Sequence, residues 1–182
     1  MEFLSTLWMP IVVSSVLIFI ASYLTHMVLP HHKGEWQGLP NEGSVLGVLQ
    51  GTPPGSYMIP YCSGMEEMKN PEFLEKQKRG PNGTIVLWDG PVNMSRNLGL
   101  TFLSYVIIGV FVAYVAWNSL GAGPHEYLKL FRITGACAFM AHGMALIPQA
   151  IWYKGIRLWA CLLDALIYAL LLAGVFGWLW PK

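Results

Sequence analysis

The sequence LWACLLDALIYALLLAGVFGWLW, residues 158–180, decides the fold class of this chain. It is apolar except for a few side chains, and Asp164 is the single charged residue in it. The hydrocarbon core of a bilayer is about 30 Å thick, and a helix of about 20 residues crosses it. The stretch therefore predicts a transmembrane helix that carries one carboxylate.

Three further stretches upstream have similar length and polarity, at residues 7–29, 98–119 and 131–152. The composition agrees, because 54% of the residues are hydrophobic and only 12% are charged, against about 25% charged in soluble proteins. We therefore predict an all-α membrane protein with a bundle of four transmembrane helices. The short turn at 153–157 makes the last two helices an antiparallel hairpin. A net charge of +1 gives no sign of a nucleic-acid partner.

Residues 30–97 differ in kind from these four stretches and are polar and rich in proline and glycine. Within them, Asn70-Pro71-Glu72 predicts a helix start, with a capping side chain, a proline at the first position and an acidic first turn. Thr84–Trp88 reads as a short strand. Because the apolar residues are too few for a separate core, we expect a small extramembrane cap that packs on the membrane helices.

The distribution of basic residues predicts the orientation. Most of the 11 Lys and Arg residues lie on the side of the cap and of the 153–157 turn. The positive-inside rule therefore favours a cytoplasmic cap, although the rule weakens for loops as long as this one.

Asp164 is the sharpest chemical signal in the sequence. A carboxylate within a membrane span costs several kcal/mol unless it is paired, solvated or protonated, so it must face protein or water. Tyr168 and Arg157 share its helical stripe. One interpretation is a proton-relay or ligand-anchoring carboxylate. The other is a structural acid paired with His142, Gln149 or Arg157.

His142 lies in the least apolar of the four stretches, on a seam of small and polar residues that must face other helices. It is interpreted either as a proton carrier or axial ligand, or as a hydrogen-bonded core histidine. Counting depth from the hairpin turn places His142 and Tyr168 near mid-membrane, and His26, Gln149, Arg157 and Asp164 toward the leaflet beneath the cap. These six residues predict a polar pocket within the membrane that opens toward the cap.

His26, His31 and His32 lie within seven residues of one another at the end of the first predicted helix. They are candidate metal ligands, with Glu35 or Cys62 as further donors. Adjacent histidines in an extended segment point to opposite faces, so we expect at most one of His31 and His32 to join His26. The alternative is that all three are polar interface residues that mark the helix end.

Five stretches resemble a family of uncharacterised bacterial inner-membrane proteins of similar length with four predicted transmembrane helices. They are LPHHKGEW (29–36), GSYMIP (55–60), KRGP (78–81), LDALIY (163–168) and AGVFGWLWP (173–181). No activity is known for that family. The resemblance therefore implies a multi-pass protein of the bacterial inner membrane and says nothing of its chemistry.

The sequence contains no common catalytic motif and identifies no cofactor. Our first functional hypothesis is an accessory or assembly subunit, or a module that binds a small molecule or lipid, with other membrane subunits or further copies as partners. The alternative is a redox, metal- or haem-dependent membrane enzyme that uses His142, Asp164 and Tyr168. A second alternative is a proton-coupled transporter, which with four helices would act as an oligomer.

Overall fold

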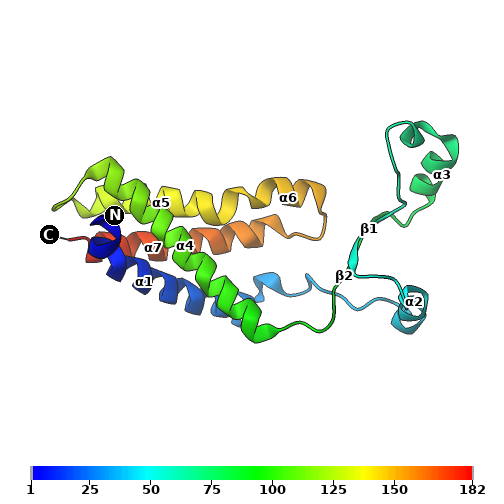
Figure 1. The fold of residues 1–182 in the computed structure, drawn as a ribbon, viewed down its shortest axis with the longest axis horizontal. Coiled ribbons are helices and arrows are strands. Elements are labelled where there is room, and N and C mark those ends of the chain that lie inside the picture. The colour runs from blue at the N-terminus through cyan, green and yellow to red at the C-terminus, as the bar shows by residue number, and fades with distance from the viewer. Residues whose placement is uncertain (1, 182) are drawn as a thin grey trace. The chain divides into compact units, whose positions relative to one another are not determined.

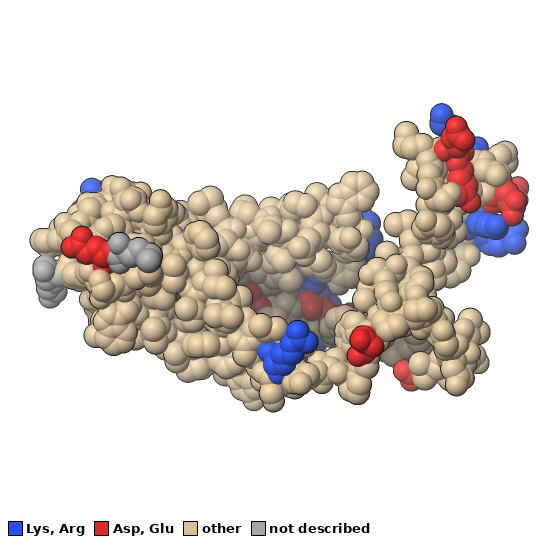
Figure 2. All heavy atoms as spheres, viewed as in Figure 1, with Lys and Arg blue, Asp and Glu red and all other residues tan. Residues whose placement is uncertain are grey.

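The computed structural model describes residues 2–181 and is mostly helical (Figure 1). Within these residues, four helical segments are long and apolar enough to cross a membrane, the number that the sequence predicts. Their bounds are Glu2–Val28, Met94–Leu120, Tyr127–Trp152 and Leu158–Leu179. Charged side chains are sparse along the flank of these helices that Figure 2 shows, as the apolar surroundings of a membrane require.

Two of the four spans contain a π-helical turn, which ends the first span and interrupts the third. The first span consists of helix α1 (Glu2–Tyr23) and the π-helical turn Leu24–Val28. The third consists of α5 (Tyr127–Phe139), the π-helical turn Met140–Met144 and α6 (Leu146–Trp152). The other two spans are the continuous helices α4 (Met94–Leu120) and α7 (Leu158–Leu179). Such turns are rare and frequently mark functional sites, and each one here carries a histidine, His26 or His142.

Helix α7 packs against α5 and α1, and α4 packs against α1. Small residues allow the close approach of α5 and α7. A Cβ atom added at Gly135 would lie 3.2 Å from the Cβ of Ala173, and one at Gly143 would lie 3.1 Å from the Cβ of Ala165. This tight seam fixes the position of Asp164 on α7 relative to the third span.

Residues Gly38–Asn93 form a separate compact unit, shorter at both ends than the predicted cap. It contains α2 (Glu42–Leu49), a 3₁₀ turn (Glu67–Lys69), α3 (Pro71–Arg79) and strands β1 (Gly55–Ile59) and β2 (Gly83–Leu87). The two strands pair antiparallel. Helix α3 starts as predicted, because the Asn70 side chain accepts a hydrogen bond from the Glu72 amide at 2.9 Å. Phe73 is the one buried residue among those described in this unit, which agrees with the expected lack of a separate core.

The segment that follows the first span belongs to the helical unit up to Gln37. Its residues Pro30–His32 form a 3₁₀ turn. The two adjacent histidines are therefore held close to the end of the spans and within reach of α7.

Candidate metal centre

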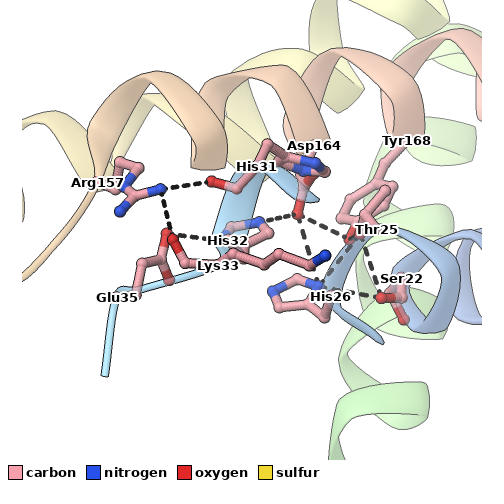
Figure 3. Close-up of polar contacts among 10 residues, drawn as sticks. All are labelled: Ser22, Thr25, His26, His31, His32, Lys33, Glu35, Arg157, Asp164 and Tyr168. Atoms are coloured by element: carbon pink, nitrogen blue, oxygen red, sulfur yellow. Dashed lines mark hydrogen bonds and ion pairs between the residues drawn. The ribbon is translucent and has the colours of Figure 1, made fainter. Parts of the chain in front are cut away.

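Asp164 lies at the centre of a polar cluster that joins α7 to the segment after α1 (Figure 3). The residue is only 3% exposed. Its Oδ1 accepts a hydrogen bond from His31 Nε2 at 2.7 Å, and its Oδ2 accepts one from His32 Nε2 at 2.9 Å. His26 Nδ1 lies 3.6 Å from Oδ2, and the Tyr168 hydroxyl donates to the same oxygen at 3.5 Å. Three imidazoles thus surround a buried carboxylate that would otherwise be strongly destabilised.

Both members of the His31–His32 pair reach Asp164, while only His32 of the pair joins His26 in the group of candidate metal donors. The prediction for this pair assumed an extended segment, in which neighbouring side chains point to opposite faces. In a 3₁₀ turn successive side chains are only about 120° apart. Pro30 begins this turn, and the Lys33 amide closes it by donating to the Pro30 carbonyl at 3.0 Å.

Arg157 holds this turn against the start of α7. Its Nη1 donates to the backbone carbonyls of His31 at 2.9 Å and of Lys33 at 3.1 Å. The sequence placed Arg157 in the pocket as a partner for the Asp164 carboxylate. In the structure it fixes the backbone that carries the histidines instead.

His32 lies between two acids. Its Nδ1 donates to Glu35 Oε1 at 2.7 Å, while its Nε2 faces Asp164. Burial alone would lower the pKa of His32, but the hydrogen bonds and negative charges of Asp164 and Glu35 together raise the pKa above its ordinary value. Both acids therefore favour the protonated form of the His32 ring.

His26 forms the open side of the cluster, because its side chain is 55% exposed. Its ring stacks on that of His32, with centroids 4.4 Å apart and an angle of 9° between the planes. Its Nδ1 lies 3.0 Å from the Ser22 carbonyl and 3.2 Å from Thr25 Oγ1. Thr25 is buried and bonds the Tyr168 hydroxyl at 3.1 Å. The sequence did not single out Ser22 and Thr25. The only sign of their role in the sequence is that both lie within the four residues before His26.

The donor atoms of His26, His32 and Asp164 all lie within 4.8 Å of one another. Nitrogen and carboxylate ligands bind zinc at about 2.0–2.2 Å, so two ligands in a tetrahedral shell lie roughly 3.4 Å apart. The separations from Asp164 Oδ2 to His32 Nε2 and to His26 Nδ1 are 2.9 Å and 3.6 Å. The donor atoms are close enough for one metal ion, but the His26 ring would have to rotate out of its stack on His32 and give up its contact with the Ser22 carbonyl, because a metal lies in the plane of each imidazole that binds it.

Two residues of the predicted pocket lie outside this cluster. His142 reaches it only through Tyr168, since their ring centroids are 5.5 Å apart, and the His142 Nε2 atom is buried without a hydrogen-bond partner within residues 2–181. Tyr105, which the sequence did not single out, contacts the same ring at 5.8 Å. The Gln149 side chain is exposed. Cys62, the other suggested donor, lies in the separate unit.

Comparison with known proteins finds no family model, curated protein or solved structure that matches this chain. The chemistry of the site must therefore be inferred from its own residues.

Proposed function

We propose that this chain is a membrane metalloprotein that binds one divalent first-row transition-metal ion through His26, His32 and Asp164. The observation that carries the proposal is the convergence of these three donors from two distant parts of the chain. The proposal develops the metal-dependent alternative from the sequence. The role of an accessory or assembly subunit and the bacterial inner-membrane location stay predictions.

The donor set narrows the class of metal. Two imidazoles and one carboxylate suit zinc, iron and other late first-row ions better than magnesium or calcium. Three protein ligands leave a coordination position open, which is typical of catalytic rather than structural sites. A metal held here would supply Lewis acidity or an activated water molecule at the open position.

The surrounding residues are arranged to support such a site. His32 would hold a metal through Nε2, which leaves the hydrogen bond from Nδ1 to Glu35 in place. This gives the carboxylate–histidine–metal pattern that orients ligands in known sites. The bond from His31 to Oδ1 fixes the Asp164 carboxylate, so that Oδ2 stays directed to the metal position. Arg157 holds the backbone of the same segment.

The test is metal binding by the full chain purified in mild detergent and stripped with a chelator. We expect about one equivalent of Zn²⁺ or Co²⁺ to bind per chain, with a cobalt absorption spectrum typical of four or five ligands. His32→Ala should abolish this binding. His125→Ala is the matched control, because His125 lies in the 121–126 loop and its Nε2 bonds the Gly121 carbonyl.

Either of two results would contradict the proposal. If the wild-type protein takes up no metal at an excess of Zn²⁺, Co²⁺ and Fe²⁺, or if His32→Ala binds as well as His125→Ala does, the cluster is not a metal centre. Its role would then be to lock the segment after α1 against α7.

A further inference from the structure

A groove between α1 and α4 extends to the candidate metal centre at His26. Its volume is about 570 Å³, within the range of about 300–1,000 Å³ that ligand sites occupy. Its walls are mostly apolar and include Phe19, Tyr23, Met27, Leu98 and Tyr105. His26 also lines it. The same histidine is thus part of both the groove and the metal cluster.

The groove is open to the surroundings of the helices. Tyr23 is 60% exposed and Met27 is 72% exposed, and both belong to a span that is apolar enough to cross the membrane. No Lys, Arg, Asp or Glu is among the residues that line the groove. An apolar chain from the bilayer is therefore the natural occupant of its walls.

The polar end of the groove requires an oxygen acceptor. The Nδ1 edge of His26 faces Asp164, so the opposite edge of this exposed ring carries Nε2 (Figure 3). A neutral imidazole that binds metal through one nitrogen carries its proton on the other. The occupant's head group would therefore meet an N–H donor at His26 and the open position on the metal.

Charge favours an anionic head group. Lys33 and Arg157 balance Asp164 and Glu35, so a divalent ion leaves the site with net positive charge when its histidines are neutral. Phosphate groups are most often recognised by arginine side chains that present paired donors. Here Arg157 already donates to the carbonyls of His31 and Lys33, which favours the smaller carboxylate.

We propose that the groove binds a long-chain carboxylate of the fatty-acid type, with its chain between α1 and α4 and its carboxylate at His26 and the metal. This inference rests on the proposed metal centre and names the class of ligand that the centre takes.

The test uses the metal-loaded full chain in detergent and a fluorescent long-chain polyene carboxylate as the probe. Palmitate should displace the probe, whereas hexadecanol, with the same chain and a neutral head, should compete about tenfold less well or worse, because it loses a charge-assisted hydrogen bond. Lysophosphatidate, which offers a phosphate head on one chain, should also compete less well than palmitate.

Groove-filling variants supply the structural control. Leu98→Trp should weaken probe binding by about tenfold or more by occupying the groove. Leu100→Trp is the matched control, because Leu100 lies on the same helix, is 52% exposed and does not line the groove. Ile20→Trp, on the α1 wall, serves if Leu98→Trp does not accumulate.

Metal content is measured on every sample, so the two proposals fail separately. Full metal content with probe binding unaffected by Leu98→Trp or Ile20→Trp overturns the groove assignment alone. Equal competition by hexadecanol, or stronger competition by lysophosphatidate, overturns the carboxylate assignment. Absence of metal from wild-type protein overturns the metal centre, and with it the head-group contact proposed here.

Discussion

Asp164→Asn changes the buried carboxylate to an amide of almost the same shape, so it tests the electrostatics of the cluster with little effect on packing. The carboxylate accepts hydrogen bonds from His31 and His32, whose side chains are each only 9% exposed. An amide has one oxygen and one NH₂ group. One of the two histidines would therefore face a donor in place of an acceptor.

The magnitude follows from these contacts. Hydrogen bonds to charged groups contribute about 1.5–3 kcal/mol each, and removal of one partner from a buried charged pair costs about 3–5 kcal/mol. We expect metal-free Asp164→Asn to lose about 3 kcal/mol of stability, since the exposed His26 and the pairing of His32 with Glu35 limit the loss. The same change removes the only anionic ligand from the proposed metal site.

The assay is thermal unfolding in detergent, with and without metal. A ligand at 100 times its dissociation constant stabilises the native state by about 2.7 kcal/mol. Wild-type protein and His125→Ala should show this gain, and Asp164→Asn should not. An Asp164→Asn protein that is as stable as wild type without metal would refute the electrostatic reasoning. One that is stabilised equally by metal would refute the assignment of Asp164 as a ligand.

Three further substitutions test separate parts of the structure. Glu35→Gln should lower the metal affinity by about 10- to 100-fold in a zinc competition titration, because it weakens the hydrogen bond that orients the His32 ring. An unchanged affinity would show that Glu35 does not support the site. His142→Leu should stabilise the protein by about 1 kcal/mol, measured as a higher unfolding temperature in detergent, because it removes a buried nitrogen that has no hydrogen-bond partner among residues 2–181. A loss of stability would point to a polar contact at this atom. Gly143→Ala should lower the stability by about 1–3 kcal/mol in the same measurement, because the new Cβ would lie 3.1 Å from the Cβ of Ala165. Gly99→Ala is its control, because nothing lies within 4 Å of the new Cβ there.

The four spans could be predicted because the cost of placing polar groups in hydrocarbon acts on each stretch of sequence separately. The same argument predicted that Asp164 turns inward, and the structure confirms that it is buried. The spans themselves are longer than predicted at several ends. For example, α1 begins at Glu2, because an interfacial turn of helix needs no apolar run.

The partners of Asp164 were only partly predictable, because local backbone geometry decides them. The 3₁₀ turn at Pro30–His32 brings in both adjacent histidines. The π-helical turn at Leu24–Val28 shifts the helix face that carries His26. Helical depth alone placed Gln149 beside the acid, but depth does not fix the direction of a side chain around the helix axis, and Gln149 is exposed.

The choice of residues around Asp164 favours a metal site over a purely structural lock. A lock needs one cation, and arginine is best suited to it, because its planar guanidinium can bind both carboxylate oxygens at once. The chain has such a residue in Arg157, seven positions before the acid, yet Arg157 binds the His31 and Lys33 carbonyls. The carboxylate is surrounded instead by three imidazoles, side chains whose ring nitrogens can offer a lone pair to a metal. A lock alone would gain nothing from these lone pairs, whereas a metal site requires them.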